Sequence, residues 1–213
     1  MENETLVPQL SHEEVRVLGA LIEKSRATPG YYPLTLNALI TACNQKSARI
    51  PVVEFEQHEV LEAIDGLKKK GLLAHVLGDG RSTKYRHTIA VKYPLDPAEI
   101  TVLGLLFLRG PLTVGEIKNM SGRMYDFEDL TEVQTVLTNL MHADTPFLSQ
   151  MEKRPGQKEA RYYHLFAPFD GSYAVSESSS EASSSRIEEL EQRLSALEEQ
   201  VEALKKVLDD LMN

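Results

Sequence analysis

Apolar positions recur with helical spacing near the start of the chain. Val15, Leu18, Leu21 and Ile22 lie at i, i+3, i+6 and i+7, so they share one face of a helix. Ser11 precedes this stripe, and two glutamates stand in the turn that follows, which is typical of a helix N-cap. The pattern therefore predicts an amphipathic helix that begins directly after Ser11.

Two further helices are predicted before the spacing of the apolar residues changes from that of a helix to that of a strand. Thr35 is placed to cap a second helix that buries Leu36 and Leu39. A third helix is expected from about Glu56 to Lys70, and Gly71 follows it as a glycine at the C′ position does. The first part of the chain is therefore predicted to hold three helices.

The apolar pattern then changes to the period of strands. Leu72–Leu77 and Thr83–Ile89 flank a glycine-rich turn, Gly78-Asp79-Gly80, and predict a β-hairpin. Because no helix follows the turn, it is not a phosphate-binding loop. Three helices and a hairpin make the plan of a winged helix-turn-helix domain, in which the hairpin is the wing and the third helix is the usual recognition helix.

The same order of patterns appears a second time. Four matched segments in one order predict two copies of a small domain. The pairs are Leu10–Ile22 with Leu95–Phe107, Pro33–Ile40 with Pro111–Ile117, Val60–Leu67 with Val133–Leu140, and Lys84–His87 with Arg161–His164.

The second copy carries its own start and turn signals. Asp96 before Pro97 predicts an N-cap with proline at the first helical position, and Thr113 is placed to cap the next helix. The third helix is expected from about Leu130 to Met141. The second hairpin is expected from Phe147–Met151 and Ala160–Phe166, around Pro155-Gly156.

The character of the sequence changes after Phe169. Residues 176–185 contain seven serines and two glutamates, which predicts a flexible acidic linker. Apolar residues then fill every a and d position of four heptads, a pattern typical of a coiled coil. The chain is therefore predicted to self-associate, with a dimer favoured, and the alternative is a surface helix that folds back onto the body. The predicted oligomerisation residues are Ile187, Leu190, Leu194, Leu197, Val201, Leu204, Leu208 and Leu211.

These elements predict an α+β, mainly helical fold with two tandem winged helix-turn-helix domains followed by a C-terminal coiled-coil helix. The predicted boundaries are 1–92 for the first domain, 93–169 for the second, 170–185 for the linker and 186–213 for the coiled coil. A chain of 213 residues with 42% hydrophobic content has room for packed cores in this arrangement.

The net charge of −9 is divided unevenly. Residues 176–213 hold ten acidic and four basic residues, or −6, which leaves −3 for the body. Nucleic-acid-binding domains usually run basic, so this body charge counts against a simple DNA-binding protein. The chain has no basic region leading into an apolar run, no apolar stretch of membrane-spanning length and a single cysteine. We therefore expect a cytoplasmic protein without a membrane partner.

Several segments resemble the YceH family of bacterial proteins. The resemblance covers residues 11–167 and implies tandem winged-helix domains, while it implies no particular activity. The coiled-coil tail lies outside it. The segments are Arg16–Gly19, Leu21–Lys24, Tyr32–Thr35, Asn37, Ala42–Ser47, Arg49 and Pro51-Val52, followed by Leu108–Gly110, Arg123–Tyr125, Phe127, Arg161-Tyr162 and His164–Phe166.

The densest polar cluster follows the second helix. Asn44, Gln45, Lys46, Ser47 and Arg49 are candidate contacts to nucleic acid or a partner, because amides and cations on a loop bind phosphates or base edges. The alternative is helix termination, with Asn44 near the C-cap and the two cations at the negative end of the helix dipole. About eleven residues separate the second and third helices, where a helix-turn-helix normally uses three or four.

The third helices and the hairpins differ in charge. Both helices open with carboxylates, which would meet phosphates in the major groove or, alternatively, complement the helix N-terminus. The hairpins are basic and are predicted to neutralise phosphates, although an ordinary solvated hairpin is the alternative. The carboxylates are Glu54, Glu56 and Glu59, then Glu128, Asp129 and Glu132, and the hairpin cations are Arg81, Lys84, Arg86, Lys153, Arg154, Lys158 and Arg161.

The sequence contains no catalytic or metal-ligand spacing. Cys43 lies in an apolar helical run, which predicts a small buried thiol. His87 and His164 occupy equivalent positions of the repeat, which predicts a structural role for both. We therefore expect a protein that is not an enzyme and that has no cofactor.

Two functions remain open. The first is a self-associating DNA-binding regulator whose wings and Asn44–Arg49 loop contact phosphates, with the coiled coil raising the effective concentration of the modules. The second is a protein-interaction scaffold that uses the same folds, with the acidic third helices and the acidic tail as partner surfaces. Analogy with other winged-helix proteins favours DNA narrowly.

Overall fold

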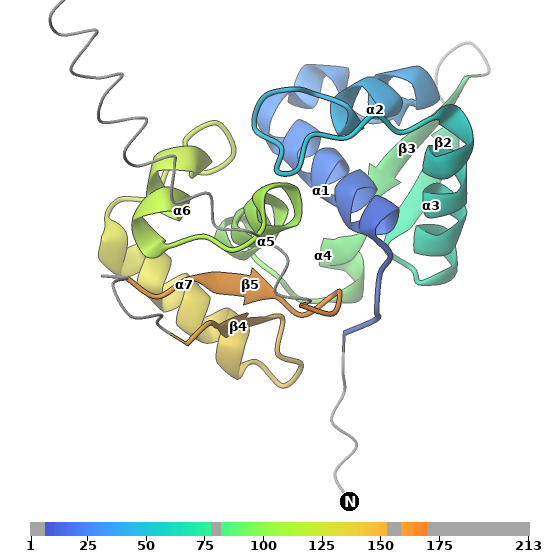
Figure 1. Ribbon diagram of the computed structural model, residues 1–213. Helices are drawn as coiled ribbons and strands as arrows, with labels where there is room; N and C mark the ends of the chain where they lie inside the picture. The colour runs from blue at the N-terminus through green and yellow to red at the C-terminus, as the bar shows by residue number, and fades with distance from the viewer. Residues whose placement is uncertain (1–6, 78–81, 153–158, 170–213) are drawn as a thin grey trace, which may run out of the picture. The chain divides into compact units, whose positions relative to one another are not determined.

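The computed structural model describes residues 7–77, 82–152 and 159–169, which belong to one compact unit. These residues form a mainly helical α+β fold with seven α-helices and two small antiparallel sheets (Figure 1). The predicted linker and coiled coil lie outside the described residues, as do Arg81, Lys153, Arg154 and Lys158. The helices are α1 His12–Ala27, α2 Leu36–Cys43, α3 Gln57–Lys69, α4 Ile89–Lys92, α5 Pro97–Arg109, α6 Val114–Ser121 and α7 Leu130–His142, with a short 3₁₀ helix at Pro29–Tyr31. The strands are β1 Leu34–Thr35, β2 Leu73–Leu77, β3 Thr83–His87, β4 Leu148–Gln150 and β5 Tyr162–His164.

Helix starts follow the capping signals of the sequence. Ser11 and Glu14 form a reciprocal capping box at α1, and Asp96 and Glu99 form the same box at α5, directly before Pro97. Each box satisfies two backbone N–H groups that the helix leaves without an internal partner. The predicted starts at Ser11 and Asp96 are confirmed.

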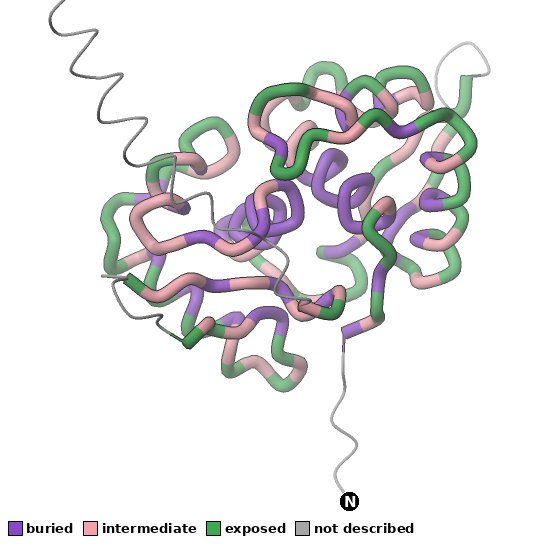
Figure 2. Tube along the Cα trace, in the orientation of Figure 1, coloured by how far each residue is buried: buried purple, intermediate pink, exposed green. Residues whose placement is uncertain are grey.

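Helices α1 and α5 pack against each other at the centre of the described unit and are buried along most of their length (Figure 2). The approach is close because a glycine stands at the crossing on each helix. A Cβ added to Gly19 would lie 2.9 Å from Phe107 Cβ, and one added to Gly104 would lie 2.6 Å from Ile22 Cγ2. Gly19 corresponds to Gly104 in the repeat, and Ile22 corresponds to Phe107, so the two contacts are reciprocal.

The two sheets repeat one pairing. The larger sheet has the order β1-β3-β2, and Leu34 of β1 pairs with Tyr85 of β3. In the second half, β4 pairs with β5, and an isolated bridge joins Leu112 to Tyr162. Leu112 and Tyr162 occupy the positions of Leu34 and Tyr85 in the repeat, so matched segments of sequence make matched contacts.

Two predicted strand ends are wrong. In the second hairpin the sequence predicts a strand that runs to Phe166, but β5 ends at His164. In the first hairpin the sequence predicts a strand that runs to Ile89, but β3 ends at His87 and Ile89 begins the short helix α4. The Thr88 N–H donates to Leu72 O at 2.9 Å, which closes the hairpin, and Ile89 is fully buried. Burial of this side chain against the core therefore ends the strand. None of the helices in the described ranges is long and apolar enough to cross a membrane.

Candidate nucleic-acid interface

Asn44 closes the long loop between α2 and α3. It is the C-cap residue of α2, and its amide makes two hydrogen bonds to Phe55. Nδ2 donates to Phe55 O at 2.9 Å, and Oδ1 accepts from Phe55 N at 2.8 Å. Both ends of the amide are therefore used inside the protein, and the helix-termination reading holds for this residue.

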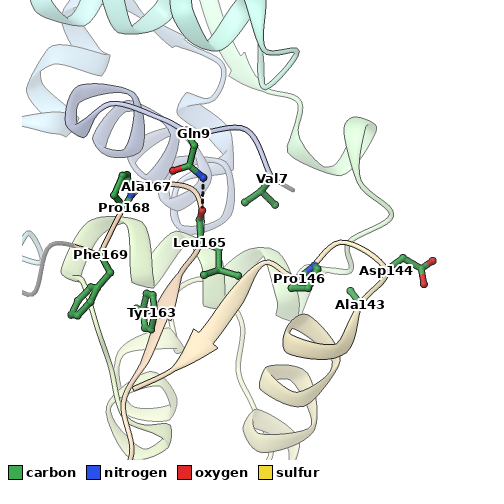
Figure 3. A pocket seen from close by; sticks show the side chains of 10 residues that line it. All are labelled: Val7, Gln9, Ala143, Asp144, Pro146, Tyr163, Leu165, Ala167, Pro168 and Phe169. Carbon is green, nitrogen blue, oxygen red and sulfur yellow. Dashed lines mark hydrogen bonds between the residues drawn. The ribbon is translucent and has the colours of Figure 1, made fainter. Parts of the chain in front are cut away.

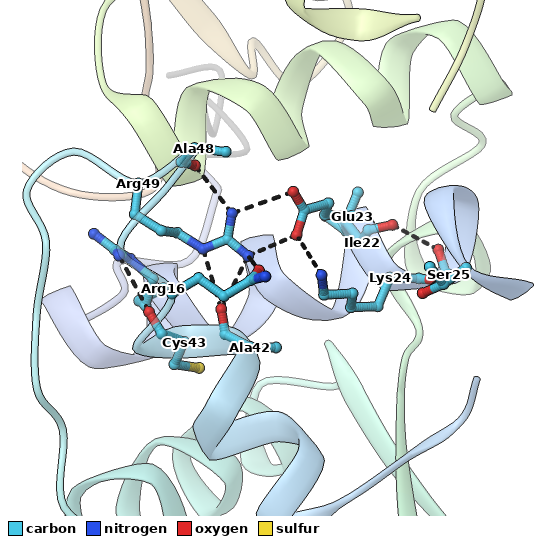
Figure 4. Close-up of polar contacts among 11 residues, drawn as sticks. Arg16, Ile22, Glu23, Lys24, Ser25, Ala42, Cys43, Ala48 and Arg49 are labelled. Atoms are coloured by element: carbon cyan, nitrogen blue, oxygen red, sulfur yellow. Dashed lines mark hydrogen bonds and ion pairs between the residues drawn. The ribbon is translucent and has the colours of Figure 1, made fainter. Parts of the chain in front are cut away.

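Arg49 lies in the interior instead of on the loop surface (Figure 4). Its Nη1 and Nη2 donate to the two carboxylate oxygens of Glu23 at 3.2 and 2.6 Å, and Nε donates to Ala42 O at 3.1 Å in the last turn of α2. The guanidinium also bonds Gln45 Oε1 at 2.8 Å and Ala48 O at 2.9 Å. With its donors occupied, Arg49 holds the loop to α1 and α2 and has no free group for a phosphate.

The carboxylate of Glu23 neutralises the buried charge of Arg49. Burial raises the pKa of Glu23, but hydrogen bonding to Arg49 and the charge of Arg49 outweigh it, so the pKa lies below its usual value. Lys24 adds a second ion pair at 3.4 Å. Of the five predicted contacts in this loop, only Lys46 and Ser47 are exposed.

Arg16 is a second interior guanidinium that sequence reasoning assigned no role. Its Nη1 and Nη2 donate to Cys43 O at 3.3 Å and to Pro51 O at 2.6 Å, so it ties α1 to the end of α2 and to the middle of the loop. The sequence did carry a signal for this role, because Arg16 stands between Val15 and Val17 in an otherwise apolar helical run. Cys43 is buried, as predicted, and burial raises its pKa to about 12, which leaves the thiol protonated and unreactive at neutral pH.

The first hairpin keeps two of its predicted cations at the surface. Lys84 and Arg86 are two residues apart on β3 and therefore share one face of the sheet, while Tyr85 points the other way and packs against the core. Arg86 is exposed and Lys84 is half-buried. No side-chain hydrogen bond or salt bridge joins either of them to another residue within the described ranges, so both charges are available to a ligand.

Arg161 in the second hairpin is already engaged. Its two terminal nitrogens donate to the two carboxylate oxygens of Glu116 at 2.7 and 3.0 Å, and Nη1 also donates to Pro111 O at 2.9 Å. This bidentate pair fastens β5 to the start of α6. Arg161 therefore acts as a link between elements, unlike Lys84 and Arg86.

The third helices of the two halves differ in their exposed faces. Exposed carboxylates precede both third helices, with Glu54 and Glu56 before α3 and Asp126, Glu128 and Asp129 before α7. The exposed face of α3 itself carries Glu62 and Asp65, with Lys68 and Lys69 in its last turn. Beyond the exposed Leu130 at its start, the exposed face of α7 carries hydroxyl, amide and imidazole groups and no carboxylate, lysine or arginine. These residues are Thr131, Gln134, Thr135, Thr138, Asn139 and His142.

The carboxylates before α7 are used by its first turn. The Asp129 side chain accepts from Glu132 N at 2.8 Å and caps the helix. Glu132 accepts from Tyr125 Oη at 2.8 Å and from Glu128 N at 2.6 Å. These bonds match the alternative reading, in which the acidic residues complement the helix N-terminus.

His87 and His164 are packing residues. His87 Nε2 lies 3.0 Å from Ser25 Oγ, and its backbone N–H donates to Tyr32 Oη at 2.7 Å. Burial lowers the pKa of His87 to about 4, with the charges of Arg26 and Arg86 acting in the same direction. Burial also lowers the pKa of His164 to about 4. Both rings are therefore neutral at physiological pH.

A cavity of about 690 Å³ lies where the first and last described residues meet (Figure 3). Its walls are mostly apolar, and Gln9 Nε2 donates to Leu165 O at 3.1 Å across one side. Asp144 is the one carboxylate among the described residues that line it, and these residues supply no acid–base pair. The described residues also contain no group of three or more His, Cys, Asp or Glu that could hold a metal ion.

Comparison with known proteins gives a consistent match across most of the chain. The model of a family described as "Protein of unknown function, DUF480" matches residues 10–157. A UPF0502 protein of Geobacter sulfurreducens is 48% identical over 158 residues, which is 74% of this chain and 72% of the relative. A UPF0502 protein of Geotalea uraniireducens is 52% identical over the same shares. A third, from Shewanella oneidensis, is 43% identical over 176 residues, or 80% of this chain and 78% of the relative.

Proposed function

The chain belongs to the DUF480 family, which includes the UPF0502 proteins of bacteria, and for this member we propose a DNA-binding function carried by tandem winged-helix domains. In this proposal α7 is the recognition helix that enters the major groove. The β2–β3 hairpin is a wing that neutralises phosphates. The protein acts without catalysis and without a cofactor.

The uncharged polar face of α7 is the observation that carries the proposal. Gln134, Thr135 and Asn139 present hydroxyl and amide groups, which pair with base edges in the major groove. The middle of the exposed α3 face carries the carboxylates of Glu62 and Asp65, which would meet phosphates, so we assign the reading of bases to α7. Gln134 Nε2 donates to Tyr162 Oη at 3.2 Å, which holds α7 beside the β4–β5 hairpin (Figure 1).

The two surface cations of the first hairpin supply phosphate contacts. Lys84 and Arg86 have no protein partner within the described ranges, whereas Arg49 and Arg161 are consumed by internal ion pairs. Phosphate contacts position a protein on DNA and make binding weaken with salt. In this proposal self-association through the predicted coiled coil brings several such modules together in the cytoplasm.

A salt titration tests the proposal. Full-length protein is titrated against labelled mixed-sequence duplex DNA at roughly 50 and 200 mM salt, and binding is expected to weaken steeply. The Lys84→Ala/Arg86→Ala variant should lower the slope of log affinity against log salt by about 2. Lys68→Ala/Lys69→Ala removes the same charge from the end of α3 and should leave the slope unchanged. Absence of binding at the lower salt, by folded protein, would reject the DNA function.

A protein-interaction scaffold is the second candidate, favoured by one surface. The acidic side of α3 also exposes Leu61, and the preceding loop exposes Ile50 and Val52, each with 52% of its surface accessible. Apolar residues beside carboxylates suit a basic partner with apolar anchors. Crosslinking of the full chain in cell extract, compared with Ile50→Ser/Val52→Ser, distinguishes this function if DNA binding fails.

A further inference from the structure

A second cavity, of about 470 Å³, lies where the end of α1 and the Gln45–Ala48 loop meet α5 and the end of α6. Its walls combine two kinds of surface. Leu105, Leu108 and Met124 supply apolar area, and several polar side chains converge from segments far apart in sequence. The volume falls in the range of small-molecule sites, which typically span about 300 to 1,000 Å³.

The charged side chains that line this cavity are mostly positive. Lys24, Arg109 and Arg123 contribute three positive charges, and Glu23 contributes one negative charge, which gives +2. Glu23 is already bound by Arg49 at 2.6 Å and by Lys24 at 3.4 Å (Figure 4). No side-chain hydrogen bond or salt bridge joins Arg109 or Arg123 to another residue in the part of the chain that the structure describes.

Arg109 is the most telling of these groups because it is half-buried. Burial lowers the pKa of its guanidinium, Glu23 raises it, and the neighbouring Arg49 lowers it again, so the pKa lies below its usual value. Glu23 is the carboxylate that acts on this partly desolvated cation, and it is already paired with Arg49 and Lys24. An anion in the cavity would supply further negative charge.

The neutral polar groups of the wall favour the same ligand. Gln45 Oε1 accepts from Arg49 Nη2 at 2.8 Å, so the end of its amide that remains is the donor end. Ser47 and Asn119 add a hydroxyl and a second amide. Donors and cations suit the oxygens of a phosphate or carboxylate, and the apolar wall suits a carbon skeleton.

We propose that this cavity is a binding site for a small organic oxyanion, a phosphate monoester or a carboxylate, held by Arg109 and Arg123. Lys24, Gln45 and Asn119 contribute further donors. The site is independent of the proposed DNA function, because it shares no residue with α7 or with the β2–β3 hairpin. It gives the protein a place for a small-molecule effector.

Calorimetric titration of the full chain with inorganic phosphate, glycerol 3-phosphate and succinate, at constant ionic strength, tests the site. At least one probe should bind, and Arg109→Gln and Arg123→Gln should each weaken it about 10- to 100-fold, as expected for hydrogen bonds to charged groups. Lys69→Gln, on the exposed end of α3, removes the same charge elsewhere and should leave binding unchanged. A preference for a phosphate or for succinate identifies the headgroup.

The stability of the free protein distinguishes a binding role from a structural one. Removing a half-buried charge that forms no salt bridge with the described residues should leave the melting temperature of Arg109→Gln equal to or above that of the wild type. Arg123→Gln alters an exposed residue and should fold normally. Two results would overturn the proposal. One is that none of the three probes binds at millimolar concentration. The other is that a probe binds both arginine variants as tightly as it binds Lys69→Gln.

Discussion

Gly104 of α5 faces Ile22 of α1 so closely that a β-carbon on the glycine would stand 2.6 Å from Ile22 Cγ2. Real side chains do not approach to this distance, so the crossing of the two central helices depends on the missing methyl group. Its repeat partner Gly19 faces Phe107 in the same way, with a distance of 2.9 Å for the added Cβ. Each half of the chain therefore supplies one glycine and one large side chain to the contact.

Gly104→Ala should destabilise the protein by about 1 to 2 kcal/mol, because overpacking a core costs about 1 to 3 kcal/mol and better helix propensity returns up to about 1. Urea unfolding followed by circular dichroism measures the change. Gly30→Ala is the matched control, since an added Cβ there has no neighbour within 4 Å. Equal stability of the two variants would show that α1 and α5 do not cross as described.

Glu23→Gln should destabilise the fold by about 3 kcal/mol, because it leaves the buried guanidinium of Arg49 without its countercharge. The Arg49 side chain is 0% exposed and the Glu23 side chain 17% exposed. Asp65→Asn breaks an exposed pair to Lys68 at 3.8 Å and should cost no more than about 1 kcal/mol. A cost for Glu23→Gln as small as that of Asp65→Asn would contradict the role assigned to the pair.

The same carboxylate should make stability depend on acid. The folded pKa of Glu23 is lowered from 4.5, so its contribution is present above pH 4.5 and is lost as the pH falls through the lower folded value. Unfolding free energies of the wild type and Glu23→Gln should therefore converge below pH 4.5. Parallel curves down to strong acid would argue that Glu23 carries no charge in the folded protein.

His164 should make a separate, acid-sensitive contribution to the free energy of unfolding. Its folded pKa of about 4 lies below the ordinary 6.5, so the neutral ring stabilises the fold above pH 6.5 and that stabilisation falls away between pH 6.5 and about 4. His164→Gln should flatten this part of the stability curve by about one proton. An unaltered slope in His164→Gln would mean that the ring is protonated inside the protein.

Thr135→Ala/Asn139→Ala should weaken binding to duplex DNA roughly tenfold or more if α7 reads base edges, because each good pair is worth about 1 to 3 kcal/mol. Both positions are exposed, and alanine is a good helix former, so stability should not fall. Glu62→Ala on the exposed face of α3 is the comparison and should keep or raise affinity. Fluorescence anisotropy with a fixed duplex measures all three, and equal affinities would remove α7 from the interface.

Local signals in the sequence predicted local structure well. The caps at Ser11 and Asp96 depend on residues three positions apart. The pairings of Tyr85 with Leu34 and of Tyr162 with Leu112 were not predicted, because they join segments far apart in the chain. Strand ends were harder, because Ile89 leaves the strand for burial in a core that periodicity does not reveal.

The roles of the arginines could not be read from spacing. In the sequence Arg49 stands in a loop and is predicted to be a surface cation, but in the structure it binds Glu23 of α1 and the carbonyl of Ala42 in α2. The oxyanion cavity shows the same limit, since Lys24, Gln45, Arg109 and Arg123 come together only in three dimensions. The sequence shows where a cationic side chain stands in the chain. Whether that side chain pairs with a carboxylate inside the protein or remains available to a ligand depends on the folded structure.

The reciprocal glycine contacts have a consequence for folding. Because α1 and α5 each form a wall of the other half's core, separating the halves would expose the apolar faces of both helices to water. We expect the duplicated halves to unfold in one cooperative transition, and either half made alone to be aggregation-prone. In that case the two halves share one folding unit, and a mutation in one half should also lower the stability of the other.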